Sequence, residues 1–404
     1  MTGRTFSFED LFSSSIPSES GSRQAHPRSR YDFGVAYPDP DSLPLAELAE
    51  ALRVGLEEKE GELALYPHPQ GYLPLREYLS EKLTRDRKLS VSAEDIMLGE
   101  GSSQLNHMII EALVDPGDVV LTEDFTYPGT LGFLRRFRAD IRGVRCDSEG
   151  MLPDALEAVL RRALSEGRRV KLIYTIPTFQ NPQGWVMSLE RRKSVLELAL
   201  CHGIPILEDD CYVDLRFEGE PVDSIASLNP EAVVYVGSFS KVIGPGMRLG
   251  YLAGSSQLLD RITAIRSGSG VSQFGALAVH RFALNGLDQH VAHINQILCN
   301  KRDAMLGALD KYFGSCFGSE VFWSRPAGGL FIWLSMPAGF DTARVAERAA
   351  KEGILFMPGV RLSPEGESGH NRARLCFGYN RPQEIIDGIA CLSEVFQKDG
   401  VAAL

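Results

Sequence analysis

A lysine with polar neighbours stands directly after an apolar run. Val233–Val236 is followed by Ser238, Ser240 and Lys241, and then, after several glycines, by Arg248. Most lysines are solvated surface residues, but one placed just beyond a buried strand is in a different environment. Such an amine acts as a Schiff-base nucleophile when burial and a nearby positive charge lower its pKa, and Arg248 supplies such a charge. The Arg248 guanidinium can also hold a phosphate.

Acidic side chains follow a second apolar run. Ile204–Leu207 leads into Glu208, Asp209 and Asp210, with Tyr212 close behind. Two interpretations are open from these residues, namely a solvated acidic turn and a metal-binding acidic pair. Tyr212 fits neither of them, and the spacing alone does not separate them.

Two further polar clusters stand at the ends of predicted elements. Val170–Pro177 leads into Asn181 beside a proline and a glycine, which by itself indicates only a turn. Ser102 and Ser103 precede a helical run at Leu105–Val114. Backbone N–H groups at the start of a helix form an anion site when hydroxyls lie beside them, but a plain serine N-cap explains the same residues.

Composition and missing motifs exclude several classes of protein. The 404-residue sequence has a formal net charge of −11, which argues against a nucleic-acid-binding surface. It holds no GxxxxGK[ST], GxSxG or HExxH motif, and its seven scattered cysteines are typical of reduced thiols. His107 is expected to be packed or exposed rather than catalytic. Without a signal peptide or a run of about eighteen apolar residues, we expect a soluble cytoplasmic protein.

Short apolar runs alternate with longer helical patterns along the chain. The expected strands are 119–121, 170–176, 204–207 and 233–236, and the expected helices include 156–164 and 188–201. This alternation predicts βαβ units and a mainly parallel sheet, with ligand groups beyond the carboxyl ends of its strands. From about Gln289 a long helical pattern leads to two more strands, at Phe331–Leu334 and Arg374–Phe377. We therefore expect an α/β protein in two lobes.

Taken in this order, the segments resemble the class I aminotransferases, which are pyridoxal-5′-phosphate (PLP) enzymes of fold type I. The likeness runs from about Tyr31 to the C-terminus. It is closest to the aminoadipate/kynurenine aminotransferase branch and to the aminotransferase-like half of MocR regulators. It rests on an ordered set of residues: Tyr66, Gly101-Ser102-Ser103, Tyr127, Asn181-Pro182-x-Gly184, Asp209-x-x-Tyr212, Ser238-x-Ser240-Lys241, Arg248 and Arg374.

The resemblance implies the fold and its domains. It implies a large domain with a mainly parallel seven-stranded sheet sandwiched by helices, plus a smaller α+β domain. On that basis we expect a mobile N-terminal arm at residues 1–30 and the N-terminal part of the small domain at 31–60. The large PLP-binding domain would cover residues 61–290, and the C-terminal part of the small domain 291–404.

The resemblance also implies catalytic roles. Lys241 would form the Schiff base with PLP and move the proton between the substrate α-carbon and C4′ of the cofactor. Asp209 would pair with the pyridine nitrogen and keep it protonated, which lets the ring withdraw electrons. Tyr212 and Asn181 would hydrogen-bond the phenolic oxygen of the ring.

The remaining matched residues would hold the cofactor and the substrate. Tyr127 would stack on the ring. Arg374 would bind the substrate α-carboxylate through its guanidinium fork. The phosphate would be held by Ser102, Ser103, Ser238, Ser240 and Arg248. The family commonly has Gln where this sequence has Ser103, and a serine hydroxyl still donates a hydrogen bond.

Tyr66 resembles the tyrosine that reaches the phosphate of a neighbouring subunit. If it does so here, the active unit is a homodimer with composite sites, and an isologous C2 dimer is the commonest oligomer.

Three functions follow from these residues. The leading one is an aminotransferase that moves an amino group between an amino acid and a 2-oxo acid, such as 2-oxoglutarate, in ping-pong fashion. The alternative is a non-transaminating PLP enzyme of the same fold, such as a lyase, a carbon–carbon bond-forming enzyme or an oxidase. A third, a ligand-sensing regulator, needs a DNA-binding winged helix. Only about thirty residues precede the match, so we do not expect one.

Overall fold

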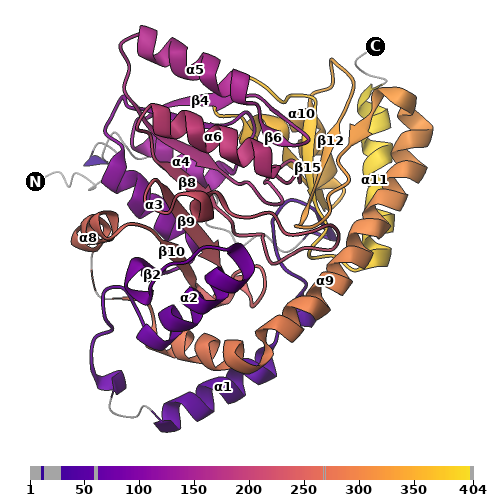
Figure 1. Ribbon diagram of the computed structural model, residues 1–404. Coiled ribbons are helices and arrows are strands. Elements are labelled where there is room, and N and C mark those ends of the chain that lie inside the picture. The colour runs from indigo at the N-terminus through magenta and orange to yellow at the C-terminus, as the bar shows by residue number, and fades with distance from the viewer. Residues whose placement is uncertain (1–10, 13–28, 59–61, 267, 269, 401–404) are drawn as a thin grey trace, which may run out of the picture.

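A seven-stranded sheet forms the centre of the larger part of the molecule (Figure 1). The computed structural model describes residues 11–12, 29–58, 62–266, 268 and 270–400. The strand order is β2-β10-β9-β8-β7-β3-β4, and β10 is antiparallel to both of its neighbours while the rest are parallel. The strands are β2 Ile96–Gly99, β10 Gly250–Ala253, β9 Val233–Ser238, β8 Ile206–Asp209, β7 Val170–Thr175, β3 Val119–Glu123 and β4 Asp140–Val144.

The central strands are apolar and buried because helices cover both faces of the sheet (Figure 1). The helices are α2 Leu73–Arg87, α3 Ser102–Leu113, α4 Pro128–Arg136, α5 Pro153–Ser165, α6 Leu189–Cys201, α7 Ile225–Leu228 and α8 Ser256–Ile265. Helix α3 packs against α4, α8 and strands β9 and β10, whereas α5 packs against α6, β4 and β7. The predicted mainly parallel seven-stranded sheet is confirmed.

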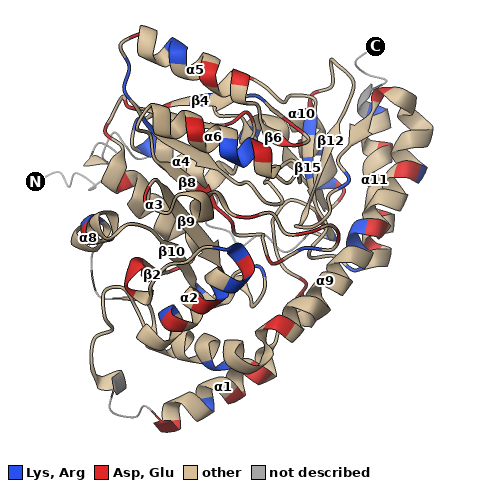
Figure 2. Cartoon of the chain, viewed as in Figure 1, with Lys and Arg blue, Asp and Glu red and all other residues tan. Residues whose placement is uncertain are grey.

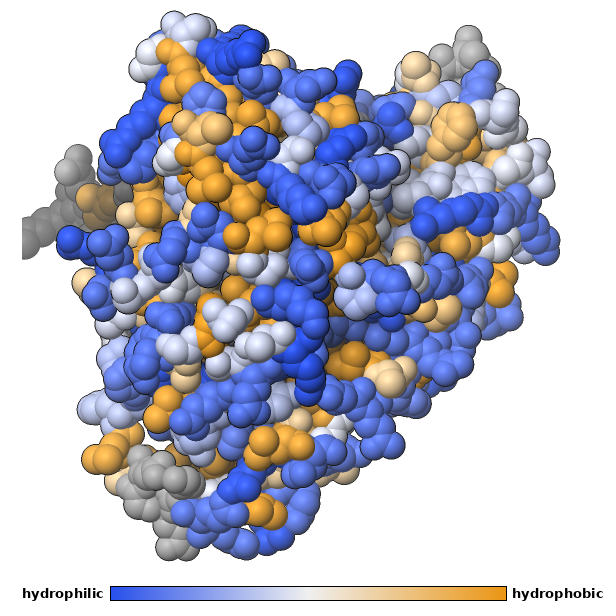
Figure 3. Space-filling model, in the orientation of Figure 1, coloured by the Kyte–Doolittle hydropathy of each residue, from blue (hydrophilic) through white to orange (hydrophobic). Residues whose placement is uncertain are grey.

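Charge and hydropathy follow this layering. Strands β9 and β10 carry no charged side chain, and the charged residues of Figure 2 lie mostly on the helices and loops around the sheet. Figure 3 shows that hydrophilic side chains cover most of the visible face, with apolar patches between them. Short hairpin strands β5 Cys146–Asp147 and β6 Gly150–Met151 lie outside the main sheet.

One long helix connects the two parts of the molecule. Helix α9 spans Gln273–Phe317 and is capped by the Ser272 hydroxyl, which accepts from Gly275 N. It contacts α2 and α1 (Leu45–Glu58), and also α11 (Pro382–Gly400), so it runs along both parts (Figure 1). The sequence prediction placed its start near Gln289, which was wrong. The preceding turns are as buried as the later ones, and the small residues in them masked the helical period.

A four-stranded antiparallel sheet forms the core of the smaller part. Its order is β11-β12-β15-β14, with β11 Phe322–Trp323, β12 Phe331–Ser335, β15 Arg372–Cys376 and β14 Met357–Pro358. Helix α10 (Thr342–Lys351) packs against β14, and α11 packs against α10 and α9. Strand β1 Tyr31–Asp32 pairs in parallel with β13 Ile354–Leu355. The chain near its N-terminus therefore lies beside this sheet.

Two expectations concern the ends of the chain and membranes. Most of the arm predicted for residues 1–30 falls outside the described residues. None of the helices among the described residues combines the length and the apolar character needed to cross a bilayer.

Candidate active site

A cavity of about 340 Å³ lies where strands β7, β8 and β9 end, between the two parts of the molecule. All the predicted site residues except Tyr66 line it. They are Ser102, Ser103, Tyr127, Asn181, Asp209, Tyr212, Ser238, Ser240, Lys241, Arg248 and Arg374. Most of them converge because the carboxyl ends of parallel strands meet at one edge of a sheet, whereas Arg374 comes from β15 Arg372–Cys376 in the smaller part. Tyr66 instead projects from the surface and is 92% exposed in the single chain.

Lys241 faces this cavity from the turn that follows β9. Its Nζ donates a hydrogen bond of 2.9 Å to the carbonyl oxygen of Ala36. Burial lowers the pKa of the Lys241 amine, and the positive charges of Arg374 and Arg248 lower it further. A lysine with a lowered pKa has a larger neutral, nucleophilic fraction near neutral pH.

Asp209 is the last residue of β8, and its carboxylate is buried in a set of donors. Oδ2 accepts from Asn106 Nδ2 at 2.7 Å and from Tyr174 Oη at 2.8 Å, while Oδ1 lies 2.7 Å from Cys211 Sγ. Burial raises the pKa of Asp209, and the hydrogen bonds from Cys211, Tyr174 and Asn106 oppose that rise. A positively charged group close to Oδ1 would favour the ionised form of the carboxylate.

The sequence analysis missed Asn106, Tyr174 and Cys211. One signal for Asn106 was available, because it lies one helical turn after Ser102 and so shares its face of α3. Tyr174 lies inside an apolar strand, and no local pattern distinguishes it from the core residues around it. Cys211 occupies one of the two unspecified positions between Asp209 and Tyr212.

The start of α3 and the turn after β9 form a cup of donors. Gly101 has a φ of 80°, and the first turn of α3 begins at Ser102. Arg248 Nη2 donates to the carbonyl oxygen of Glu100 at 2.6 Å, so the guanidinium lies beside the helix start. A Cβ on Gly250 would approach Ser102 N to 2.9 Å, which leaves glycine as the residue that fits there. Hydroxyls, helix N–H groups and a guanidinium together suit a phosphate.

Asn181, Tyr212 and Arg374 form a hydrogen-bonded chain on another wall. Asn181 Nδ2 donates to Tyr212 Oη at 3.1 Å, and Arg374 Nη1 donates to Asn181 Oδ1 at 2.8 Å. Arg374 Nη2 donates to the carbonyl oxygen of Gly34, whereas Nε is buried without a partner among the described residues. The peptide bond between Asn181 and Pro182 is cis. The guanidinium also lies over the ring of Phe331, at 4.6 Å from its centroid.

The acidic run around Asp209 is neither a solvated turn nor a metal site. Successive residues of a strand face opposite sides of the sheet, so Glu208 and Asp210 point away from the cavity. Both are fully buried, and they pair with Arg192 and Arg87 respectively. No group of three or more potential metal ligands occurs among the described residues. His107 packs against Phe133 and Phe137, as expected.

Comparison with known proteins identifies the family. The family model described as aminotransferase class I and II matches residues 34–385. The chain belongs to the class I and II aminotransferases. It is 33% identical to aromatic-amino-acid aminotransferase 1 of Thermococcus litoralis, over 90% of this chain and 87% of that relative.

Two further relatives correspond to the two groups of proteins that the sequence resembles most. A crystal structure of kynurenine aminotransferase from Pyrococcus horikoshii, in complex with PMP (pyridoxamine phosphate), superposes with a TM-score of 0.88 at 32% identity. It covers 97% of this chain and 98% of that one. An uncharacterised HTH-type transcriptional regulator of Bacillus subtilis, YisV, is 30% identical over 91% of this chain and 73% of the regulator.

As a member of this family, the aminotransferase is a PLP-dependent enzyme, and the predicted fold type I is confirmed. The residues in the cavity fit that cofactor. A lysine with a lowered pKa suits its aldehyde, the donor cup at α3 suits its phosphate, and the buried Asp209 carboxylate suits its ring nitrogen. No comparison favours the non-transaminating alternative.

Proposed function

We propose that this aminotransferase takes its amino group from amino acids with apolar or aromatic side chains. The observation that carries the proposal is the lining of the cavity. Lys241, Arg248 and Arg374 are the cations among the described lining residues, and each has a proposed role in binding the cofactor or the substrate α-carboxylate. Other parts of the wall are uncharged, namely Val35, Tyr37, Pro128, Ile176 and Met357. A second substrate carboxylate would meet no further cation among these described residues of the single chain, whereas an apolar side chain would be desolvated favourably. The aromatic-amino-acid aminotransferase and the kynurenine aminotransferase among the relatives are in line with this class.

Lys241 is the proposed covalent anchor and proton carrier. When bound, PLP supplies an aldehyde that condenses with amines and a protonated ring that withdraws electrons from the reacting carbon. Lys241 Nζ would take the proton from the substrate α-carbon and would carry it to C4′ of the cofactor. The lowered pKa of Lys241 supports this role, because a general base must be neutral before it accepts a proton.

The other residues hold the reacting groups in place. Asp209 pairs with the ring nitrogen, and Tyr127 stacks on the ring. Asn181 and Tyr212 donate to the phenolic oxygen, while Arg374 binds the substrate α-carboxylate with its fork. The phosphate is held by Ser102, Ser103, Ser238, Ser240 and Arg248.

We also propose a cytoplasmic homodimer in which Tyr66 reaches the phosphate of the neighbouring subunit. Tyr66 is 92% exposed in the single chain, so its side chain is available to a neighbouring subunit. The proposed small domain comprises residues 31–60 and 291–404, and the proposed PLP-binding domain comprises residues 61–290. The boundary at 290–291 falls within α9.

The proposal is tested by a half-reaction on purified holoenzyme. Borohydride should fix the cofactor to the peptide that carries Lys241, and Lys241→Ala should abolish the fixation. L-phenylalanine and L-tyrosine should convert the bound cofactor stoichiometrically to pyridoxamine phosphate, much faster than L-aspartate or L-glutamate. Faster conversion by the acidic amino acids would overturn the substrate class. Return of the cofactor to its starting form without pyridoxamine phosphate would instead indicate a lyase.

A further inference from the structure

Arg192 is a fully buried arginine outside the cavity, on helix α6. A guanidinium has five N–H donors in a fixed plane. Here every one of its nitrogens has an acceptor within hydrogen-bond distance. The acceptors are Met187 O (3.0 Å from Nε), Glu208 Oε1 and Asp223 O (3.4 and 3.2 Å from Nη1), and Pro177 O and Thr178 Oγ1 (both 3.0 Å from Nη2).

Three of these acceptors belong to the loop that carries Asn181. Pro177 and Met187 are the two ends of this loop, and Met187 N also donates to Pro177 O at 2.7 Å. Arg192 therefore binds both ends of the loop at once. Asn181 lies between them and reaches the cavity, where it contacts Tyr212 and Arg374.

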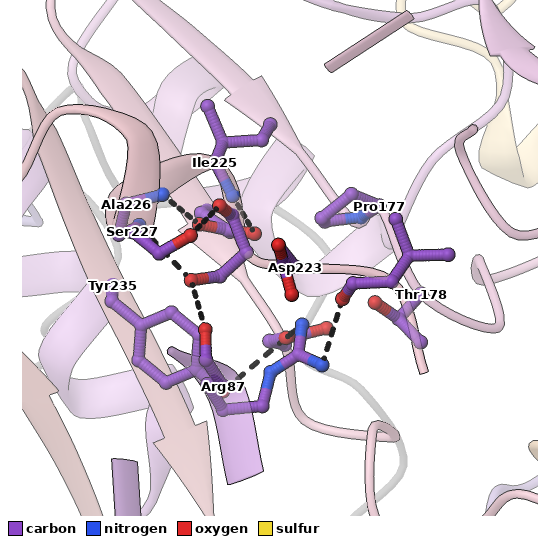
Figure 4. Close-up of polar contacts among 12 residues, drawn as sticks. Arg87, Pro177, Thr178, Asp223, Ile225, Ala226, Ser227 and Tyr235 are labelled. Carbon is purple, nitrogen blue, oxygen red and sulfur yellow. Dashed lines mark hydrogen bonds and ion pairs between the residues drawn. The ribbon is translucent and has the colours of Figure 1, made fainter. Parts of the chain in front are cut away.

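A fourth acceptor of the Arg192 guanidinium, Glu208, lies on the strand that carries Asp209. Glu208 precedes Asp209 in β8, and its carboxylate accepts from the backbone N–H groups of Ile225 and Ala226 at 2.9 and 2.8 Å. Figure 4 shows Ile225 and Ala226 on one side of this network and Pro177 and Thr178 on the other. One rigid cation thus joins the Asn181 loop to the end of β8.

We propose that Arg192 is a positioning residue for transamination, which fixes the Asn181 loop relative to β8 so that Asn181 and Asp209 keep their spacing in the cavity. The inference rests on the proposed roles of Asn181 and Asp209. Lysine cannot replace this residue fully, because an ammonium has three donors and no planar fork. The loop would then lose part of its attachment while the buried positive charge is kept.

A matched control lies at the end of helix α2. Arg87 is also buried and pairs with Asp210, the residue after Asp209, at 2.6 Å, and it donates to Val222 O at 3.1 Å. It makes no hydrogen bond with the loop 177–187 among the described residues. Arg87→Lys therefore damages a buried ion pair beside Asp209 without releasing Asn181.

The test is a pH titration of the cofactor absorption band in the holoenzyme, together with the dissociation constant of PLP. Removing a donor from an anionic oxygen raises its proton affinity. We expect Arg192→Lys to raise the pKa at which the cofactor absorption band changes by about 0.5 to 1 unit, the effect of losing roughly one hydrogen bond. Arg87→Lys should leave this pKa unchanged, even if thermal unfolding shows that it destabilises the protein as much as Arg192→Lys does. Asn181→Ala should raise this pKa by a similar amount. The double variant Asn181→Ala/Arg192→Lys should raise it little further.

Thr178→Val provides a milder variant in case Arg192→Lys does not fold, because it removes one acceptor of Nη2 and preserves the side-chain shape. It should produce a smaller shift in the same direction. An unshifted band in both variants, or an equal shift in Arg87→Lys, would overturn the positioning role. A wild-type protein whose cofactor cannot be fixed at Lys241 would instead overturn the proposed function itself, so the two failures are distinguishable.

Discussion

Tyr174 Oη donates a hydrogen bond of 2.8 Å to Asp209 Oδ2, and both side chains are buried. Tyr174 belongs to β7 and Asp209 to the adjacent parallel strand β8. The bond therefore crosses between neighbouring strands and holds the carboxylate that faces the cavity. Asn106, from helix α3, binds the same oxygen from a third element.

Tyr174→Phe should weaken PLP binding about tenfold. The change removes one donor to a buried carboxylate, and a hydrogen bond to a charged group contributes roughly 1.5 kcal/mol or more. Without it the pKa of Asp209 rises further, so the anion that pairs with the ring nitrogen is less favoured. The dissociation constant of PLP, measured by fluorescence titration of the apoenzyme, checks this.

Tyr235→Phe is the matched control for this prediction. Tyr235 lies on β9, and its hydroxyl bonds Asp210 Oδ2 at 3.2 Å on the opposite side of the sheet from the cavity. Its loss should reduce stability while PLP affinity is retained. Equal weakening of PLP binding in both variants would contradict a specific role for Tyr174.

Arg374→Ala should lose amino-acid affinity but keep the cofactor. Truncating one partner of a buried, hydrogen-bonded charge pair costs about 2–5 kcal/mol, which corresponds to a fall in kcat/KM of roughly 30-fold or more. Steady-state kinetics and the PLP content of the variant are the measurements. Arg372→Lys, two residues earlier on the same strand and outside the cavity lining, should change neither. Loss of PLP from Arg374→Ala would argue that Arg374 serves the cofactor instead.

Glu123→Gln should stabilise the protein more at high pH than at low pH. Burial raises the pKa of Glu123 to about 7, although its carboxylate accepts from Thr126 Oγ1, Thr175 Oγ1 and Ile176 N. The folded state thus binds the proton more tightly than the unfolded state, so the wild type loses stability as pH rises from about 4.5 to 7. The neutral amide does not titrate. The free energy of unfolding of Glu123→Gln, relative to that of the wild type, should therefore increase by up to about 3 kcal/mol across that window.

Urea unfolding of both proteins at pH 5, 6, 7 and 8 measures this difference. The gap between the two curves should widen up to about pH 7 and then stay constant. Parallel stability curves over the whole range would show that Glu123 titrates alike in the folded and unfolded states.

Subunit mixing tests the composite site. Tyr66→Ala and Lys241→Ala should each be weakly active or inactive alone. In a mixed dimer, one site combines the intact Lys241 of the first variant with the intact Tyr66 of the second. Co-refolded mixtures should therefore recover up to about a quarter of wild-type activity, as random pairing gives half mixed dimers with one good site each. Activity no higher than the sum of the separate variants would contradict the role of Tyr66.

The sequence alone predicted the type of the sheet, and it selected residues that the structure, with the exception of Tyr66, brings together at one cavity. Lys241, Asp209 and Asn181 follow strands that were visible as buried apolar runs, and the end of a parallel strand is where ligand groups collect. The order of the motifs then indicated the family. The start of α9 was misplaced because a helix buried on several sides lacks a simple amphipathic period.

Only the tertiary structure decided what surrounds those residues. The sequence left Glu208 and Asp210 open as a turn or a metal site, and packing placed them behind the sheet against Arg192 and Arg87. Asn106 and Tyr174 meet at Asp209 from elements far apart in the chain, and no local pattern encodes such contacts. Apolar runs are local patterns, so the sequence showed where strands end and which residues follow them. The partners that fix their charge and position come from long-range packing, which is settled only when the whole chain folds.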